Sequence, residues 1–554
     1  MTRRLSPALA MLVAGVALLA AAAAPGGSGA VEGRKGGTLR LASVDDVTVD
    51  TALAYDPTSW PIQVATCAKL FNYLDADGAE GTKVVEEVVR DYDLSADRRT
   101  YTFELRRTFR FHTGAPVTAQ SFADAFDRVA QPILRERRDG KTEKVESLAR
   151  GFMGEIVGAQ AVMEGKAARI TGVRVLGRYR LQIRLTRPVG DFIFRLTLPF
   201  FCPIVPGTPS TETATLAGSG PYYVAEYVPN QRIVLRRNRF YRGARTANVD
   251  QVEWTIGITP EACLLAVEED RIDHCVNVGI PPAAYKGLYE KYGVNRPGGR
   301  LFVSPRLATW YLVFNHDRPA FRGRVQIPLK KAINYVIDRP ALTRPFGYLA
   351  GKRTDQVLPP ALGRAASIYP LDGPNLAAAR REYAKALYEP TKLVLYIANR
   401  PATIAMAQSL EFDLKKLGID LELKYFDHAV AHEKVAIRGE PYDLFLQGWI
   451  ADYPDGGNFL ATLLDGRSIG PTDNYSNQAY FDDPETNARI DAANRLSGEA
   501  RREAWADLDV DLMRDNPPLA PIFHQNQRAF VSKSFGCFVL HPLNGVSIVA
   551  ACKK

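Results

Sequence analysis

The fold class is indicated by residues 393–425, which read LVLYIANRPATIAMAQSLEFDLKKLGIDLELKY. Residues 393–397 form an apolar run of strand length, and Pro401 stands where a helix can begin, since proline fits the first helical turn. Apolar residues then recur at steps of three and four, and Gly418 ends the pattern: Ile404, Ala407, Leu410, Leu414 and Leu417. Residues 419–425 alternate as in a second strand. Such a strand–helix–strand unit predicts a parallel sheet with a right-handed crossover.

A further strand is predicted at residues 443–446, and it leads directly into Gly448. The segment from Gly448 to Asp455 reads GWIADYPD and holds two aromatic rings and two carboxylates. Rings supply apolar walls and a carboxylate can pair with a cationic ligand group. Ligands of open parallel sheets bind beyond the carboxyl ends of strands, so the loop starting at Gly448 is the first candidate ligand site. On residue types alone, a polar turn with a packed tryptophan explains the segment equally well.

The first half of the chain has a mixed pattern. Apolar and polar residues alternate over 101–106, which predicts a half-buried strand. After a turn at 112–114, Thr118 is placed to cap a helix. Two more alternating strands are predicted around residues 181–185 and 233–235. With 554 residues in all, the chain is expected to fold as two or more domains or lobes.

Residues 1–30 have the order of a cleaved signal peptide. Arg3 and Arg4 precede an apolar or small-residue run over 8–24, and cleavage is expected after Ala30. A retained membrane anchor is the alternative, but the run is short and rich in alanine. We therefore expect an exported protein.

The six cysteines fit an oxidising compartment. The first of them is Cys67, so no cysteine follows the apolar run directly and a lipoprotein is not expected; this favours a free periplasmic protein. Six cysteines allow fifteen connectivities, and Cys263 with Cys275 and Cys537 with Cys552 are the first pairs to consider because they are close in sequence. Their spacings match no tight zinc pattern.

Several other patterns contain residues that could serve catalytic or metal chemistry. His428 and His432 are four residues apart and could share a metal on one helix face, but position 436 is alanine, so no zinc-protease motif follows and a solvated helix face is favoured. Asp452 and Asp455 lie too close in one loop to flank a sugar as glycosidase carboxylates do. We expect no catalytic residue, metal or cofactor. The net charge of +9 is dispersed along the chain, so no nucleic-acid partner is expected.

The segment 448–455 closely resembles the signature of extracellular solute-binding protein family 5, the dipeptide- and oligopeptide-binding proteins of ABC importers. Other segments that resemble the family follow in its order: TYTFELR at 100–106, FRFHTGAPVTA at 109–119, GSGPY at 218–222, RNRFY at 237–241, TWYLVFN at 309–315 and AINYVIDR at 332–339. Each segment alone is a weak match, but together in order they form a strong one.

The resemblance implies an α/β fold of two lobes that close like a Venus flytrap, a type II periplasmic binding protein with an extra subdomain inserted in the first lobe. The expected division is residues 31–50, 180–304 and 522–554 for lobe one, 51–179 for the inserted subdomain and 305–521 for lobe two. It further implies a monomer that delivers short peptides to a membrane permease.

The resemblance also implies the site residues. Asp452 matches the aspartate that pairs with the α-ammonium group of a bound peptide. The expected ligand-binding residues are Gly448, Trp449, Ile450, Ala451, Asp452, Trp310, Tyr311 and His524. The peptide is expected to lie extended and hydrogen-bonded like an added strand.

Two departures from the family pattern affect the local surface. Residues 322–328 read RGRVQIP where an Asp-x-Arg-x-Arg run is usual, and Gly456 stands where proline is usual. The family also binds metal chelates, haem and sugars, so a non-peptide solute is the alternative ligand. A secreted hydrolase is the remaining alternative and would turn its substrate over.

Overall fold

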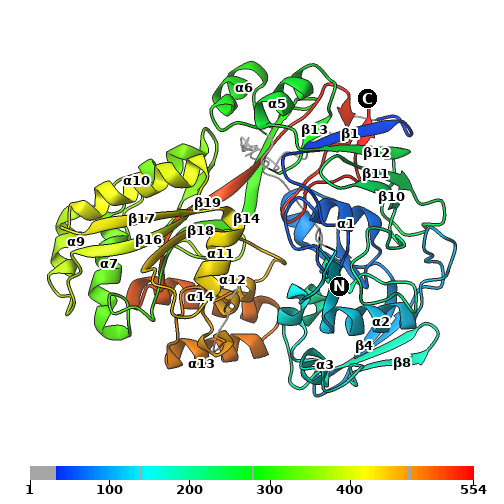
Figure 1. Cartoon of the computed structure of the whole chain (residues 1–554), viewed down its shortest axis with the longest axis horizontal. Helices are drawn as coiled ribbons and strands as arrows, with labels where there is room; N and C mark the ends of the chain where they lie inside the picture. The colour runs from blue at the N-terminus through cyan, green and yellow to red at the C-terminus, as the bar shows by residue number, and fades with distance from the viewer. Residues whose placement is uncertain (1–32, 138–139, 278–279, 471–473, 475) are drawn as a thin grey trace, which may run out of the picture.

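The structure is a computed structural model, and it describes residues 33–137, 140–277, 280–470, 474 and 476–554. The predicted signal peptide at residues 1–30 lies outside the described residues. Two lobes lie side by side, with lobe two on the left of Figure 1 and lobe one with its inserted subdomain on the right. This is the predicted two-lobed α/β fold. Of the helices in the described residues, none is long and apolar enough to cross a membrane.

Lobe two is built on a six-stranded sheet with the order β15-β19-β14-β18-β16-β17. Its strands are β14 (Leu301–Phe314), β15 (Gly351–Arg353), β16 (Lys392–Ala398), β17 (Asp420–Phe426), β18 (Leu444–Ile450) and β19 (Leu519–Phe530). β16 pairs in parallel with both β17 and β18, whereas β14 is antiparallel to β18 and β19. The predicted parallel strand–helix–strand unit is confirmed, with helix α10 (Pro401–Lys415) as its crossover.

Helices cover both faces of this sheet. Buried side chains of α7 (Ile327–Val336), α8 (Arg339–Thr343), α9 (Leu376–Tyr383) and α10 form one core with it. The opposite core is formed with α11 (His428–Ala436), α12 (Gly457–Leu464), α13 (Pro484–Arg495) and α14 (Gly498–Asp515). Because both faces are buried, the strands are nearly continuous apolar runs, which explains the pattern at residues 393–397.

Lobe one contains a five-stranded sheet with the order β10-β11-β12-β1-β13. Its strands are β1 (Thr38–Ser43), β10 (Tyr222–Val228), β11 (Arg232–Arg237), β12 (Gln251–Ile256) and β13 (His274–Cys275), and its helices are α1 (Trp60–Thr66), α5 (Pro260–Glu268) and α6 (Ala284–Tyr292). β1 lies between β12 and β13 and is parallel to both. The hairpin β10–β11 confirms the predicted strand around residues 233–235.

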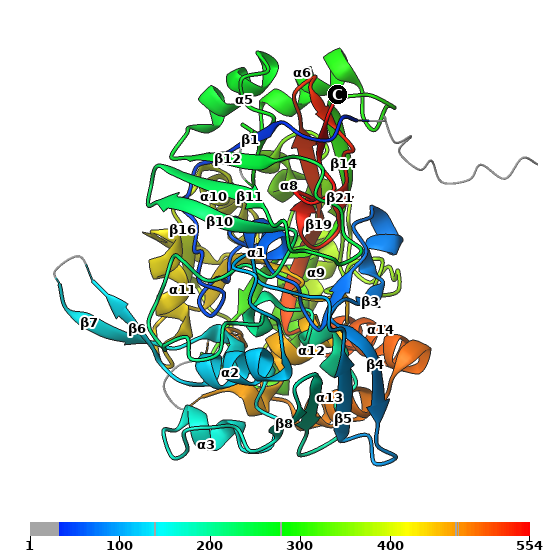
Figure 2. The ribbon, with the colours of Figure 1, turned by 90° about the vertical axis from the view of Figure 1, so that its right-hand side faces the viewer.

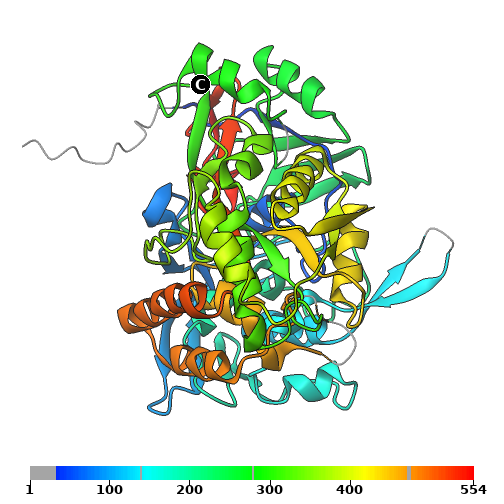
Figure 3. The same ribbon diagram turned by 90° about the vertical axis from the view of Figure 1, so that its left-hand side faces the viewer.

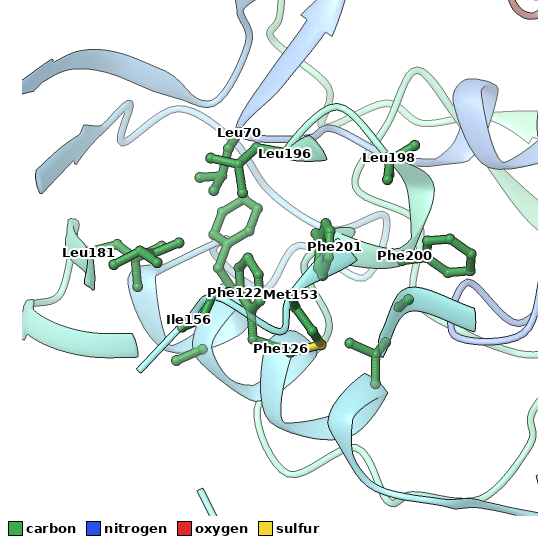
Figure 4. Packing of buried hydrophobic residues seen from close by; sticks show 14 of the residues in the cluster. Leu70, Phe122, Phe126, Met153, Ile156, Leu181, Leu196, Leu198, Phe200 and Phe201 are labelled. Carbon is green, nitrogen blue, oxygen red and sulfur yellow. The ribbon is translucent and has the colours of Figure 1, made fainter. Parts of the chain in front are cut away.

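The inserted subdomain has its own sheet, in the order β4-β5-β9-β8. The strands are β4 (Val89–Leu94), β5 (Thr100–Leu105), β8 (Val173–Gly177) and β9 (Arg180–Arg184), and helix α2 (Ala119–Ala130) begins after the predicted cap Thr118. Figure 4 shows Phe122 and Phe126 of α2 packing toward Phe201 and Met153. β9 pairs with β5 and β8. This strand therefore belongs to the subdomain sheet, although the expected boundary at residue 180 placed it in lobe one.

β14 and β19 are long antiparallel strands that run from one lobe into the other (Figure 1). Their register shifts between Pro305 and Thr309, where three residues of β14 lie against Gln525. A bulge of this kind bends and twists a strand pair. This bulge lies where β14 and β19 pass between the two lobes (Figure 1), and we call it the crossing point.

Three disulfides crosslink the described part of the chain. Cys263–Cys275 and Cys537–Cys552 confirm the two predicted pairs, and Cys67–Cys202 closes a much longer loop. No described cysteine is free. The long-range pair links the loop after α1 to the segment after η3 (Pro199–Phe201).

A hairpin of β6 (Ile133–Glu136) and β7 (Thr142–Val145) projects from the subdomain in Figures 2 and 3. The remaining short elements are β2 (Phe71–Tyr73), β3 (Val84–Glu86), α3 (Ala159–Met163), α4 (Phe192–Arg195), β20 (Phe535–Gly536), β21 (Leu540–His541), β22 (Gly545–Val546) and β23 (Cys552–Lys553).

Candidate ligand-binding site

The strand before the predicted site is longer than the sequence indicated. β18 continues through Gly448 and Trp449 to Ile450, so the loop begins at Ala451 rather than at Gly448. The strand continues because β14 supplies a hydrogen-bonding partner, with Ala308 opposite Ile450. The Ala451 N–H then donates to the carbonyl oxygen of Leu307 at 2.8 Å. The loop after β18 is thus anchored to β14 at the crossing point between the lobes.

Gly448 is explained by its neighbour on β14. The Trp310 side chain lies over Gly448, and a Cβ atom there would come within 2.9 Å of Trp310 Cε2. The Trp310 indole is held by Phe346, with ring centroids 4.7 Å apart, and by a hydrogen bond from Nε1 to Gln525 Oε1 at 3.3 Å. Glycine is needed here to admit the indole, not to make a turn.

Asp452 is a buried carboxylate without a cation. Its side chain is 5% exposed. Oδ1 accepts a hydrogen bond from the Tyr55 hydroxyl at 2.7 Å, and Oδ2 accepts one from Asn458 Nδ2 at 2.8 Å. Among the described residues Asp452 has no ion-pair partner. Burial raises the pKa of Asp452 to about 6, although the two hydrogen bonds oppose this rise.

Asn458 holds the loop in shape. Its Oδ1 accepts the backbone N–H of Asp452 at 2.8 Å and the indole N–H of Trp449 at 3.4 Å, while its Nδ2 donates to the Asp452 carboxylate. Asn458 belongs to α12, which begins at Gly457. The start of this helix therefore positions both the backbone and the carboxylate of Asp452.

Tyr55 reaches Asp452 from the other side of the lobe boundary. Its ring stacks on Phe200 at 5.6 Å between centroids and meets Trp60 edge-on at 5.8 Å. Both partners belong to the hydrophobic cluster that forms the subdomain core, to which α1 contributes Trp60, its first residue. An ionised carboxylate can accept about four hydrogen bonds, so Asp452 keeps acceptor capacity after those from Tyr55 and Asn458.

The next residues of the loop contact two different parts of the protein, Tyr453 the subdomain and Asp455 helix α14 of lobe two. The Tyr453 ring lies in the subdomain core, and its hydroxyl donates to Asp191 Oδ2 at 2.7 Å. Asp455 forms a two-armed ion pair with Arg501, at 2.8 and 2.7 Å. Asp455 also accepts the Gly457 N–H at 2.8 Å. Held in this way within the same loop as Asp452, Asp455 is not placed to face Asp452 across a sugar.

The structure gathers only part of the expected set. Gly448, Trp449 and Ile450 are half-buried at the end of β18, and Ala451 and Asp452 follow them. Trp310 is half-buried on β14, opposite Gly448. Tyr311 is instead 1% exposed within the lobe-two core. His524 is also buried, 3.0 Å from the Thr309 hydroxyl, and burial lowers its pKa to about 3. A ligand contact for Tyr311 and His524 stays a prediction.

Tyr55 and Asn458 are the site residues that sequence reasoning missed. Asn458 follows Asp452 by six residues at a helix start, a position where a side-chain amide commonly bonds nearby backbone. The role of Asn458 in bonding the nearby backbone could therefore have been predicted from the sequence. Tyr55 is 397 residues away from Asp452 in sequence, and no local pattern pointed to it.

The histidine pair lies on α11, as its four-residue spacing predicts. The rings of His428 and His432 are 4.7 Å apart, and His432 meets Phe445 of β18 edge-on at 5.2 Å. Burial lowers the pKa of His432 to about 4. Within the described ranges no group of three or more His, Cys, Asp or Glu side chains could hold a metal ion. His428 is exposed and His432 half-buried, so the face is only partly solvated.

Comparison with known proteins places this geometry in a family. A profile described as bacterial extracellular solute-binding proteins, family 5 Middle, matches residues 83–471. The probable deoxycholate-binding periplasmic protein of Escherichia coli (strain K12) is 24% identical over 80% of this chain and 80% of its own length. The periplasmic murein peptide-binding protein of the same organism is 26% identical over 93% of this chain and 92% of its own.

A solved structure shares the fold over almost the whole chain. The clavulanic acid biosynthesis oligopeptide binding protein 2 superposes with a TM-score of 0.79 at 24% identity, covering 94% of this chain and 96% of the other. At this identity the similarity establishes the fold alone. The two-lobed architecture with an inserted subdomain is therefore shared.

Proposed function

Because the chain belongs to the bacterial extracellular solute-binding proteins of family 5, we propose that it is a periplasmic receptor that captures short peptides for an ABC importer. A receptor of this kind holds its ligand between two closing lobes and passes it unchanged to a membrane permease. Related proteins named for peptide binding support this choice of ligand. We propose that this receptor catalyses no reaction and binds no nucleic acid.

The observation that carries the proposal is the uncompensated charge of Asp452. Isolated buried charges are costly, and a buried carboxylate is normally paired with a cation. Asp452 instead has two neutral donors among the described residues, Tyr55 and Asn458. The α-ammonium group of a peptide would supply the missing positive charge between the lobes.

The neighbouring residues supply the remaining features of the proposed site. Half-buried Trp449 bonds the same Asn458 side chain as Asp452 and offers apolar surface close to it. Half-buried Ile450 and Trp310 are proposed to extend this surface along the strand ends. Tyr311 and His524 are buried, so we propose that they contact the ligand only if a movement of lobe two exposes their side chains. The peptide backbone would be held by main-chain hydrogen bonds at the strand ends, which leaves its side chains in permissive pockets.

A non-peptide solute is the second candidate, because one relative is named for deoxycholate binding. Native mass spectrometry of gently purified mature protein, before and after acid release, separates the two candidates. A ladder of short peptides supports the proposal. A single non-peptide mass keeps the transport role and overturns the pairing of Asp452 with a peptide ammonium group. Release of chemically altered products would instead indicate a hydrolase.

A further inference from the structure

A second uncompensated charge, of opposite sign, lies at the crossing point between the lobes. Arg306 is on β14 in the three-residue shift of register between Pro305 and Thr309. The carbonyl of the next residue, Leu307, accepts the N–H of Ala451. Arg306 therefore lies on the strand segment that anchors the Asp452 loop.

The guanidinium of Arg306 has no partner among the described residues. Its Nε is shielded from solvent and makes no hydrogen bond, and no acidic side chain forms an ion pair with it. Burial lowers the pKa of Arg306 to about 10, with no opposing acidic neighbour. The residue as a whole is half-buried rather than sealed in a core. The Arg306 side chain is thus partly shielded from solvent but still partly exposed.

Three other enclosed arginines have hydrogen-bond or ion-pair partners among the described residues. Arg339 is fully buried and donates to carbonyl oxygens of Thr354, Pro521, Asn334 and Pro370. Two further arginines also have a shielded Nε without a hydrogen bond, but both form ion pairs, Arg195 with Glu155 and Arg353 with Asp372. Arg306 differs from them because it has neither kind of partner.

A guanidinium in this position is suited to one kind of ligand group. Its planar fork matches a carboxylate with two parallel hydrogen bonds, and such charge-assisted bonds strengthen where water is excluded. Leaving it unpaired costs free energy in the ligand-free protein. A ligand that brings a negative charge would remove this cost on binding.

We propose that Arg306 receives a carboxylate group of the bound solute. The inference rests on the proposed function and deepens it, because it narrows the ligand class to solutes that carry an acid as well as a cation. The carboxylate can be the C-terminus of a peptide or an acidic side chain. The chemistry is the same in both cases.

The test compares matched ligands on the mature full chain by isothermal titration calorimetry. A peptide that binds the wild-type protein is measured beside its C-terminally amidated form and beside a form whose acidic side chain is replaced by its amide. We expect one of these two changes to weaken binding by roughly tenfold or more, and the form that does so identifies the source of the carboxylate. Arg306→Gln should bind the acid and the amide equally, and Arg306→Lys should keep part of the preference.

A second measurement distinguishes a ligand residue from a structural one. Arg306→Met should raise the thermal unfolding midpoint of ligand-free protein, because it removes an unpaired enclosed cation. The matched control is Arg528→Met on the paired strand β19. Arg528 donates to carbonyl oxygens of Phe346 and Tyr348 at 2.9 and 2.8 Å, so its loss should lower the midpoint and leave the acid-to-amide ratio unchanged.

The outcomes separate this inference from the proposed function. Equal wild-type affinity for the acid and both amides would overturn the role of Arg306 while leaving peptide capture intact. If wild-type protein yields a non-peptide solute instead, peptide capture fails. The Arg306 inference then stands if that solute is acidic and is lost from Arg306→Gln, and falls if the solute is neutral or is retained.

Discussion

The Tyr55 hydroxyl lies 2.7 Å from Asp452 Oδ1 and donates a hydrogen bond to it across the boundary between the lobes. Tyr55 packs in the subdomain, whereas Asp452 follows a strand of lobe two. Movement of the lobes apart would break this hydrogen bond. Asp452, the carboxylate proposed to pair with the ammonium group of the ligand, is thus also part of the contact that joins the lobes.

Replacing Asp452 tests the proposed pairing directly. Asp452→Asn keeps the shape of the side chain but removes its charge, and it should weaken binding of a peptide with a free α-ammonium group by ~2–5 kcal/mol. Calorimetric titration with that peptide and its N-acetylated form measures the effect. Unchanged affinity of the variant for the free peptide would remove Asp452 from the site.

The raised pKa of Asp452 predicts pH-dependent binding. The ligand-free carboxyl titrates at about 6, and a bound ammonium group would lower that pKa. Affinity should therefore be full near pH 7 and fall as the pH drops below about 6, because protonation removes the charge that the ligand needs. Titrations from pH 5 to 7.5 measure the profile. A wild-type profile as flat as that of Asp452→Asn would contradict the prediction.

Asp452 and Asp509 should contribute to the stability of the ligand-free protein with the opposite pH dependence. Burial raises the pKa of Asp452 to about 6 and that of Asp509 to about 7, above the ordinary value of 3.8. Between about pH 4 and 7 the folded state holds more protons at these groups than the unfolded state. Their contribution to the free energy of unfolding falls as the pH rises through this window. Denaturant unfolding from pH 4 to 7 should therefore show that the free energy of unfolding of Asp509→Asn, relative to that of the wild-type protein, rises with pH. A constant difference would contradict the prediction.

The variant Tyr55→Phe should separate the effect of lobe closure from the effect of the Asp452 charge on ligand binding. The hydrogen bond from Tyr55 lowers the pKa of Asp452, so its loss should move the midpoint of the pH–affinity profile to higher pH. It should also favour the open form in small-angle scattering. A variant with wild-type midpoint and wild-type scattering would show that the hydrogen bond is dispensable.

Gly448→Ala should be destabilising because of Trp310. The added Cβ would lie 2.9 Å from Trp310 Cε2, and relief of such overpacking costs ~1–3 kcal/mol. The matched control is Gly287→Ala in α6, where a Cβ meets nothing within 4 Å. Equal unfolding free energies for the two variants would contradict this account of Gly448.

Loss of the long-range disulfide should cost more than loss of the short-range one. Cys67 and Cys202 are 135 residues apart, against 12 for Cys263 and Cys275. The chain-entropy account gives ~5 and ~3 kcal/mol respectively. Paired serine variants compared by denaturant unfolding measure the difference, and a larger loss for the short loop would overturn this ranking.

Local patterns were read correctly where a segment contains the cause of its own structure. Residues 393–425 fold as the predicted strand, helix and strand because apolar periodicity and Pro401 act within a few residues. Thr118 caps α2 for the same reason. The end of β18 was read incorrectly, because its last residues are held in the strand by β14, more than a hundred residues earlier.

The sequence by itself determined the class of fold, the family resemblance and the position of Asp452 after a buried strand. Only the tertiary structure decided what surrounds that carboxylate: Tyr55 from the subdomain, Asn458 from α12 and no cation among the described residues. Only the tertiary structure left Arg306 without a partner in the described part of the chain. The physical reason is that periodicity and capping depend on neighbours in sequence. The charge state of a buried group depends on whatever the fold places within a few ångströms of it.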